Sequence, residues 1–501
     1  MLVVDLFQTL VDFLSLSHIS FLLVGLVIGI ILGATPGVGG VLGMAIVLPL
    51  TLGIDGISAV LLLVSIYLGS LYGGAVSAIL MNVPGTSAAI ASTFDGYPLA
   101  QKGRGEYALA ISAIASALGG IISAILLIIL TPFLVSLVLR IGTVHYFLIA
   151  VLGIALLPLI TQGSHIKGLF AGAFGLLITT IGVAPTAITV RYDLGQPEMY
   201  NGLDYIAILI GLFAITEMIV LLGLQKGSIV DKSIESRTTS EIREGFQYTI
   251  RNPITIVKSS LIGIFIGAVP GAGATISNFI AYGESVRSSK NKDSFGKGNP
   301  LGLLATEASN SATAAGSLVP VLAFAIPGGA ASAIILGAMI LHGIVPGPDL
   351  FTSEVQTTYT IFISIGLGSM LLLIFGVLII TRAEQITRVD KDNIIPIVIV
   401  LAIAGAYTLD ANHVDIITVF IFGVIGYFFR MYDYSIVALV LGAILGGLIE
   451  TNLFRALRAS GGSYSIFVSD WISILLVLAI FAVSVGPYVG LLITNIQSRY
   501  C

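Results

Sequence analysis

Long apolar segments are the feature that most limits what this chain can fold into. Uninterrupted runs of membrane-spanning length lie at 107–131, 144–161, 166–185, 203–224, 355–381, 394–411, 412–430, 434–454 and 465–493. About 17–25 apolar residues cross the hydrocarbon core of a bilayer as a helix. Only 10% of the 501 residues are charged, whereas a soluble domain carries about 25%. The chain is therefore predicted to be an all-α polytopic membrane protein.

Pro-Gly pairs interrupt four further apolar segments, at 18–54, 57–93, 253–282 and 302–345. Proline removes a backbone donor and glycine permits a positive φ, so the helix is expected to unwind at each pair. The freed backbone groups cannot face lipid, and they are tolerated only inside protein or beside a wet cavity. We therefore expect re-entrant or discontinuous helices at these places.

Matching landmarks recur in the same order in both halves of the sequence. The segment 33–40 (GATPGVGG) is identical to 267–274 (GAVPGAGA) at five of eight positions. A second Pro-Gly pair follows in each half, within 82–87 and within 325–330. A lone acid then lies in an apolar segment near the end of each half. Agreement of three landmarks in one order indicates an internal duplication.

The duplication predicts a transmembrane repeat at 1–224, a polar linker at 225–252 and a second transmembrane repeat at 253–501. Basic residues favour the cytoplasmic face of a membrane, so the linker is predicted to lie there. If the first Pro-Gly segment enters and returns on the outside, an odd number of crossings separates the copies, and the repeats are inverted. Simple full spans at Pro36 and Pro270 are the alternative, and they give a poorer charge balance.

Glycines and polar residues gather at the interruptions and predict a substrate site. Half-helix N-termini offer N–H groups and partial positive charge to an anion, and unwound carbonyls can hold a cation. Hydroxyl and amide side chains suit a carboxylate-bearing solute because they donate and accept hydrogen bonds. The candidate substrate-binding residues are Thr35, Pro36, Gly37, Gly39, Gly40, Asn82, Pro84, Gly85, Thr86, Ser87, Pro270, Gly271, Gly273, Thr275, Ser277, Asn278, Asn310, Ser311, Pro327, Gly328 and Gly329.

Structural roles are the alternatives for all of these residues. A Pro-Gly kink can serve packing alone, and Ser or Thr can hydrogen-bond between helices. An ionised carboxylate is costly within apolar sequence, so intramembrane acids also need a role. Glu307 belongs to the polar cluster before Pro327 and is the candidate for ion coupling, with a protonated or paired structural acid as its alternative. Glu217 and Glu450 are predicted to hold helices together.

Motifs of several enzyme classes are absent from the sequence. There is no GxxxxGK[ST] loop for nucleotide hydrolysis and no HExxH zinc motif, and Cys501 is the only cysteine. The chain is therefore not expected to be an enzyme, and no cofactor or metal site is expected. No basic stripe indicates nucleic acid. Segment 95–103, with turn residues and charges, is predicted to be a cytoplasmic connector.

At these motifs the sequence resembles the large permease subunit of the tripartite tricarboxylate transporters, the TctA family. The resemblance extends over nearly the whole chain. It implies secondary transport of carboxylates such as citrate, driven by a Na⁺ or H⁺ gradient. In many systems it also implies a small membrane subunit and an extracytoplasmic solute-binding protein as partners. The residues that carry it are 33–40, Pro84 to Thr86 followed by 95–103, 270–273, and Glu307 to Pro327 with Gly328.

Two positions depart from the family pattern. Thr306 and Ser311 stand where the family favours a proline and a second asparagine. This departure leaves open which carboxylate is carried and whether the usual partners are needed.

Together these features favour a multi-pass secondary transporter of the cell membrane that moves di- or tricarboxylates, as a symporter, by alternating access at the converging broken helices. Rocking and elevator movement remain open. A moving domain on a scaffold favours a homodimer by analogy, with membrane lipid and the carboxylate as further partners. An anion or solute channel lined by the same helices is the alternative. An intramembrane enzyme acting on a lipid-linked substrate is weaker still, since no nucleophile–base pair stands out.

Overall fold

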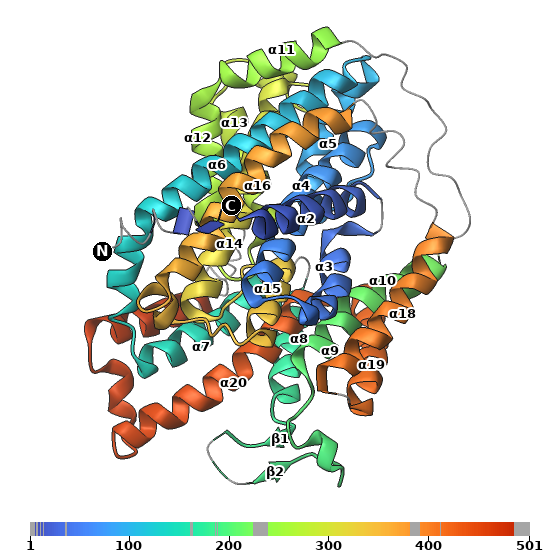
Figure 1. The fold of residues 1–501 in the computed structure, drawn as a ribbon. Coiled ribbons are helices and arrows are strands. Elements are labelled where there is room, and N and C mark those ends of the chain that lie inside the picture. The colour runs from blue at the N-terminus through green and yellow to red at the C-terminus, as the bar shows by residue number, and fades with distance from the viewer. Residues whose placement is uncertain are drawn as a thin grey trace, which may run out of the picture. The chain divides into compact units, whose positions relative to one another are not determined.

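The computed structural model is built almost entirely of helices (Figure 1). It describes residues 6, 9, 10, 12, 13, 15–35, 38–160, 164–185, 187, 189–223, 239–380, 391–410 and 412–484. Within these ranges, seven helices are long and apolar enough to cross a membrane. The chain is therefore an all-α polytopic membrane protein, as its apolar runs predicted.

By their contacts the helices group into two compact units. Unit 1 comprises residues 1–135 and 206–427, and unit 2 comprises residues 136–205 and 428–501. The repeats predicted above are defined by matching sequence and the units by packing, which are different properties. The division into two transmembrane repeats and a linker thus stays a prediction beside these units.

Unit 1 contains all four interrupted segments. Helix α6 (Gly105–Val138) starts in this unit and continues beyond it, as does α19 (His413–Met431). The other elements of unit 1 are α2 (Leu16–Ala34), α3 (Gly39–Leu50), η1 (Thr51–Gly53), α4 (Gly56–Met81), η2 (Ser87–Ala89), α5 (Ile90–Gln101), α9 (Tyr205–Leu209), the π-helical η4 (Ile210–Ile215), α10 (Thr216–Gly223), α11 (Thr239–Ile250), α12 (Pro253–Gly267), α13 (Gly273–Ser288), η5 (Lys292–Ser294), α14 (Pro300–Phe324), α15 (Ala330–Leu341), η6 (Pro348–Phe351), α16 (Val355–Ile380) and α18 (Lys391–Asp410).

Unit 2 carries the only strands within the described ranges. Val183 donates its backbone N–H to the Tyr200 carbonyl at 2.8 Å, and Gly182, with φ +96°, lies opposite Arg191. The helix predicted over 166–185 consequently ends early, because its last residues form a strand. The elements of unit 2 are α7 (Thr143–Ile160), α8 (His165–Ile178), β1 (Gly182–Val183), β2 (Val190–Arg191), η3 (Pro197–Met199), α20 (Ile436–Ala459), η7 (Tyr464–Val468) and the helix Trp471–Ser484.

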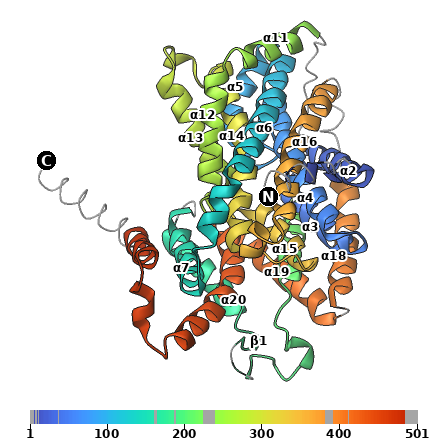
Figure 2. The same ribbon diagram turned by 60° about the vertical axis from the view of Figure 1, so that its left-hand side comes forward.

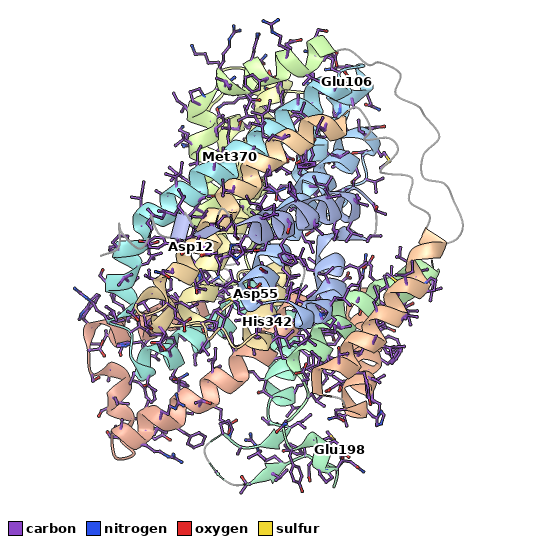
Figure 3. All side chains as sticks on the ribbon, viewed as in Figure 1. Asp12, Asp55, Glu106, Glu198, His342 and Met370 are labelled. Atoms are coloured by element: carbon purple, nitrogen blue, oxygen red, sulfur yellow. The ribbon has the colours of Figure 1, made fainter. Side chains whose placement is uncertain are left out.

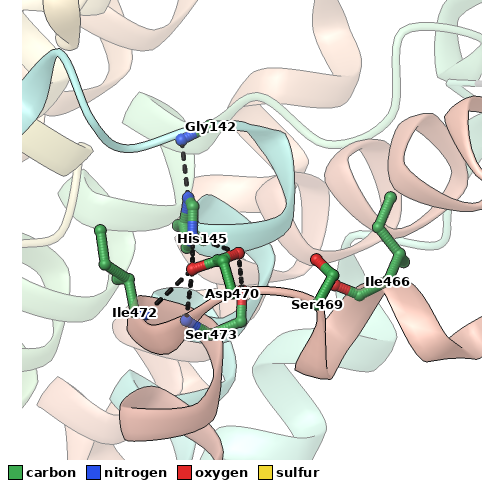
Figure 4. Close-up of polar contacts among 7 residues, drawn as sticks. All are labelled: Gly142, His145, Ile466, Ser469, Asp470, Ile472 and Ser473. Atoms are coloured by element: carbon green, nitrogen blue, oxygen red, sulfur yellow. Dashed lines mark hydrogen bonds and ion pairs between the residues drawn. The ribbon is translucent and has the colours of Figure 1, made fainter.

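A histidine–carboxylate pair anchors the start of the helix Trp471–Ser484 in unit 2 (Figure 4). Asp470 accepts the Ser473 backbone N–H at 3.0 Å, so it caps this helix. The Nδ1 atom of His145 accepts the Gly142 N–H at 2.8 Å. Nε2 of His145 therefore carries the proton, and it donates to Asp470 at 3.1 Å. Residues before α7 are thereby joined to the last described helix.

Glycines set the contact between α2 and α4 in unit 1. A Cβ on Gly25 would lie 2.5 Å from the Leu62 carbonyl oxygen. One turn later, a Cβ on Gly29 would overlap the backbone of Ile66. Only residues without a side chain allow two helices to approach so closely, which is the small-residue packing typical of membrane helices.

Helices α12 and α14 pack in the same way. A Cβ on Gly263 would lie 2.5 Å from the Ser309 carbonyl oxygen, and one on Gly267 would lie 2.6 Å from that of Thr313. Helices α12, α13 and α14 lie side by side in both ribbon views (Figures 1 and 2). The second half of the sequence therefore repeats the packing of the first half, a shorter helix against a longer one through glycines one turn apart.

Segment 95–103 is not the connector that its turn residues predicted. Helix α5 continues to Gln101, and it includes Pro98. Asp95, expected in an exposed loop, is fully buried. The reason is tertiary, because the donors that satisfy this carboxylate come from a distant part of the chain.

Candidate functional site

The two interruptions of the first half lie against one another. Helix α2 ends with Thr35 as its buried C-cap residue, and α3 begins at Gly39, whose φ is +64°. A Cβ on Gly39 would lie 3.3 Å from the carbonyl oxygen of Gly85. A Cβ on Gly85 would in turn overlap the Gly33 carbonyl oxygen. The backbone segments at the two interruptions are thus in direct contact.

The second half brings its two interruptions together in the same manner. A Cβ on Gly328 would lie 2.6 Å from the Gly267 carbonyl oxygen. Gly329, the N-cap of α15, would place a Cβ 3.9 Å from the Cα of Gly273. Gly273 has φ +62°, a conformation that side chains rarely adopt. Close backbone approach therefore explains Gly328, and a positive φ explains Gly273.

Residues from the two halves also meet. Asn278 on α13 donates its side-chain N–H to the carbonyl of Ala88 in η2 at 2.8 Å. Ser277 beside it shares a hydrogen bond with Ser309 at 2.7 Å and accepts one from Thr313 at 2.9 Å. Helix α13 of the second half thus lies against both the second interruption of the first half and the middle of α14.

Glu307 lies fully buried on α14 and is held by hydroxyl groups. Its Oε1 accepts a hydrogen bond from Ser92 on α5, and its Oε2 accepts one from Ser116 on α6 at 3.1 Å. Among the described residues no basic side chain makes an ion pair with it. The arrangement can accept a proton or a small cation, since the site supplies oxygen atoms and no fixed positive charge.

Sequence reasoning did not single out Ser92 or Ser116. Ser116 belongs to an otherwise apolar run, where a serine can hydrogen-bond to a backbone carbonyl of its own helix. The available signal was a repeated serine within one span, at Ser112, Ser116 and Ser123. That signal gives no partner, because Glu307 is far away in the sequence.

Several candidate residues carry buried polar atoms that have no hydrogen-bond partner within the described part of the chain. These atoms are Oγ1 of Thr86, Oδ1 of Asn278, both amide atoms of Asn310 and Oγ of Ser311. Leaving a buried polar group unpaired costs about 1–3 kcal/mol. Such groups in a folded protein call for an explanation such as a bound water, ion or ligand. Thr86 lies at an interruption and Asn278 lies against it, whereas Asn310 and Ser311 lie in the middle of α14.

Comparison with known proteins identifies the family. The sequence matches the model described as "Tripartite tricarboxylate transporter TctA family" over residues 19–441. The chain belongs to the TctA family. This confirms the resemblance found in the sequence motifs and makes the chain a component of a tricarboxylate transporter. Transporters of this tripartite kind include partner subunits and a solute-binding protein.

Two relatives cover different shares of this TctA chain. A protein of Agrobacterium vitis, described as "Uncharacterized 52.8 kDa protein in TAR-I ttuC' 3'region", is 31% identical over 485 residues, which are 96% of this chain and 94% of that protein. A second protein of this organism, "Uncharacterized protein in TAR-II ttuC' 3'region", is 32% identical over 208 residues, 42% of this chain and 86% of its own length. No solved structure matches the sequence.

The remaining candidate residues of this TctA chain have varied surroundings. Gly40 packs on Ser70, whose side chain a Cβ would overlap. Asn82 is the left-handed C-cap of α4, with φ 56°. Pro36 and Gly37 lie outside the described residues. Asn82 and Ser87 are exposed, Pro84, Pro270, Gly271 and Thr275 are half-buried, and Pro327 is buried.

An apolar cavity of about 230 Å³ lies beside α3. Its lining includes Leu32 of α2, Leu42 of α3 and Ile397 of α18, and carries almost no polar surface. A carboxylate would find no donor there. The described residues likewise contain no group of three His, Cys, Asp or Glu side chains that could hold a metal. This apolar cavity is therefore a poor candidate for the carboxylate site of this TctA protein.

Glu450 has a structural partner in unit 2. Arg191 on β2 binds it through two parallel hydrogen bonds, 2.9 Å from Nη1 to Oε1 and 3.1 Å from Nη2 to Oε2. Both side chains are less than a third exposed, at 28% and 18%. This pair joins the strand to α20, which agrees with the structural role predicted for Glu450.

Proposed function

We propose that this chain is the membrane carrier of a TctA-type system and moves di- or tricarboxylates across the cell membrane by alternating access, driven by a Na⁺ or H⁺ gradient. The observation that carries the proposal is the set of unpartnered polar atoms on Thr86 and Asn278, at and against an interruption, and on Asn310 and Ser311 in the middle of α14. Membership in a tricarboxylate transporter family supplies the substrate class.

The repeated packing supports two inverted repeats built on broken helices. Each long helix, α4 or α14, ends in a left-handed residue that is not glycine, Asn82 with φ 56° and Ala325 with φ 55°. In each half this residue stands three positions before the glycine of the second Pro-Gly pair, Gly85 or Gly328. The matching glycine contacts of α2 with α4 and of α12 with α14 also support one ancestral unit.

The carboxylate would bind where the N-termini of α3, α13 and α15 begin. Backbone N–H groups at a helix N-terminus attract an anion without adding a full charge to the membrane interior. Asn310 can both donate and accept hydrogen bonds, so it can read a carboxylate and an adjacent hydroxyl. Ser311 and Thr86 would supply further contacts.

Glu307 would bind the coupling ion. A carboxylate and two hydroxyl oxygens, from Ser92 and Ser116, match the preference of a hard cation for oxygen ligands. Protonation is the other possibility, since a neutral carboxyl group can donate to one serine and accept from the other. Whether Glu307 binds a cation or a proton, the ion would be held by residues of three helices, α14, α5 and α6.

A small membrane subunit and an extracytoplasmic solute-binding protein are proposed as partners, since the family is tripartite. A homodimer is proposed because a moving domain needs an immobile support in the bilayer. All residues of the proposed site come from this chain, so we expect the isolated chain to bind carboxylate.

Uptake by purified protein in vesicles tests the proposal. Radiolabelled citrate and a panel of di- and tricarboxylates are added with an inward Na⁺ gradient, an inward H⁺ gradient or neither, with the partner proteins present and absent. We expect saturable uptake that requires one gradient, and E307Q should remove that requirement or the uptake itself. Ohmic carboxylate current without a gradient would instead establish a channel.

A further inference from the structure

Asp95 is a fully buried carboxylate that the proposed transport site does not use. Its Oδ1 accepts the backbone N–H groups of Gly298 and Asn299 at 2.8 and 2.7 Å, and its Oδ2 accepts the Tyr282 hydroxyl at 3.0 Å. Gly302 is required nearby, because a Cβ there would overlap Oδ2. The carboxylate thus ties α5 to α13 and to the loop that leads into α14.

The C-terminal end of α5 is tied to the same loop at a second point. Lys102, the C-cap residue of α5, donates from Nζ to the Lys297 carbonyl oxygen. This loop belongs to the second half of the sequence, whereas α5 belongs to the first half. The contact therefore closes one end of the interface between the halves.

Helix α15 makes the reciprocal contact. It has 12 residues, as α5 does, and it follows the second Pro-Gly pair of its half in the same way. Its C-cap residue is His342, whose Nε2 lies 2.9 Å from Oγ1 of Thr51. The Thr51 hydroxyl already donates to the Leu48 carbonyl at 2.6 Å, so it must accept the proton of Nε2. Helix α15 of the second half is thus tied to the loop that leads into α4.

The two contacts differ in strength. His342 makes one hydrogen bond to a hydroxyl, and a Cβ on Gly56 would lie only 2.8 Å from its own Cβ. Asp55, labelled beside His342 in Figure 3, caps the start of α4 by accepting the Ser58 N–H at 2.9 Å. Asp95, by comparison, accepts three hydrogen bonds, and bonds to an ionised group are roughly twice as strong as neutral ones.

Asp95 also fixes the position of α5 along the axis of α14. Ser92 stands three residues before Asp95, one turn earlier on α5, and it donates to Glu307. Because Asp95 binds the residues at the start of α14, any sliding of α5 would break both contacts together. The carboxylate thereby positions a ligand of the proposed ion site without touching that site.

The basic residues place the two contacts on opposite faces. Lys102 and Arg104 flank the Asp95 contact, as do Lys290, Lys292 and Lys297 on the loop. The loop that holds Thr51 has no such residue, since the first 101 residues contain neither Lys nor Arg. By the positive-inside rule the Asp95 contact faces the cytoplasm and the His342 contact faces outward.

We propose that Asp95 and His342 are positioning residues of two reciprocal latches, the Asp95 latch closing the cytoplasmic end of the carrier and the weaker His342 latch closing its outer end. The proposal rests on the proposed function, because latches on opposite faces are needed only for alternating access. Release of the Asp95 latch lets α5 move away from α14, and release of the His342 latch lets α15 move away from α4. Because the His342 latch is the weaker of the two, the outer end opens more easily.

Thiol accessibility in C501S vesicles tests the latches without requiring transport. Reporter cysteines replace Ala91 on α5 or Ala333 on α15, both buried, and a membrane-impermeant maleimide is applied from each face. D95A should raise cytoplasmic labelling of A91C roughly tenfold, the loss expected for hydrogen bonds to a charged group. T51V should raise outer labelling of A333C by a smaller factor. D293N, a change of an exposed acid on the same loop, is the matched control and should alter neither rate.

Each result decides one question. Unchanged labelling in D95A and T51V, or opening of the same face by both, would overturn the latches even if carboxylate uptake occurs. D95A could open the cytoplasmic face and T51V the outer face although the parent protein takes up no carboxylate. That result would uphold the latches and refute the proposed transport. Should D95A fail to fold, D95N takes its place, because asparagine keeps the shape of the side chain and weakens the two backbone hydrogen bonds. Backbone hydrogen exchange at Gly298 and Asn299 should then be faster than in wild type. Unchanged exchange would overturn the proposal.

Discussion

The Ser116 hydroxyl on α6 donates to Oε2 of Glu307 on α14 across 3.1 Å, in the interior of unit 1. A second serine, Ser92 on α5, binds the other carboxylate oxygen. Three helices therefore meet at one acid that has no exposed surface. An acid in this position is costly inside a membrane protein, which is why we proposed a role in ion coupling for it.

Loss of the Ser116 hydroxyl should weaken coupling-ion binding. S116A removes one of two donors to the carboxylate, and we expect the half-saturating ion concentration for uptake to rise roughly tenfold, as for a charge-assisted hydrogen bond. S123A is the matched control, because Ser123 on the same helix donates to the Gly120 carbonyl at 2.8 Å and not to Glu307. Equal ion dependence of the two variants would remove Ser116 from the ion site.

Replacement of Asn310 should separate ligand binding from stability. Both amide atoms lack a partner, so N310L removes an unsatisfied buried group and should stabilise the ligand-free protein by about 1 kcal/mol or leave it unchanged. Carboxylate-induced thermal stabilisation should disappear. T313V is the comparison, since it loses a bond to Ser277 and should lower the melting temperature. Retained carboxylate stabilisation in N310L would contradict the assignment.

Acid should remove the stabilisation that the Asp470 carboxylate gives to the fold of unit 2. Burial alone would raise the pKa of Asp470, but hydrogen bonds from the Ser473 N–H, His145 and the Ser473 hydroxyl lower this pKa to about 2. A lowered native pKa stabilises the fold above the ordinary value near 3.8, and this contribution is lost as the pH falls toward 2.

D470N keeps a capping oxygen but loses the charge at the helix N-terminus, so it should destabilise the protein at pH 7 by about 0.3–1 kcal/mol. The difference from wild type should shrink when thermal unfolding in detergent is measured below pH 4. D433N, at an exposed acid of the same unit, should show no such pattern. A difference independent of pH would mean that the carboxylate charge does not matter.

The glycine contact of α2 with α4 should tolerate no side chain. A Cβ on Gly29 would overlap the Ile66 backbone, so G29A should cost about 1–3 kcal/mol through overpacking. Gly53 has no atom within 4 Å of such a Cβ, and G53A is the neutral control. Equal melting temperatures for both variants would show that the helices can separate without cost.

The helices could be predicted from the sequence because their signal is local. Length and the absence of charge suffice to find helices such as α16, which lies within the run 355–381, and α6, which covers the run 107–131 and continues to Val138. The Pro-Gly pairs likewise mark places where described helices end, since proline and glycine change the backbone conformation locally. Two runs depart: α8 ends at Ile178, because residues beyond it pair as a strand, and the run 465–493 begins as the 3-10 helix η7 (Tyr464–Val468), with a separate helix starting at Trp471.

The partners of the buried acids could not be predicted, since they depend on tertiary contacts. Asp95 was expected in a loop, and its donors at Gly298 and Asn299 lie more than 200 residues away, at separations of 203 and 204. Ser92 and Ser116 reach Glu307 from separations of 215 and 191 residues. Nothing in the spacing of these residues specifies such pairs.

The location of bound carboxylate tests the central claim most directly. The carboxylate that gives the largest thermal stabilisation is added to the purified protein, and its position is determined by electron cryo-microscopy. The account predicts density between the interruptions of unit 1, within hydrogen-bond distance of Asn310 and the N-terminal ends of α13 or α15. Density elsewhere, with Asn310 and Ser311 still unpartnered, would contradict it.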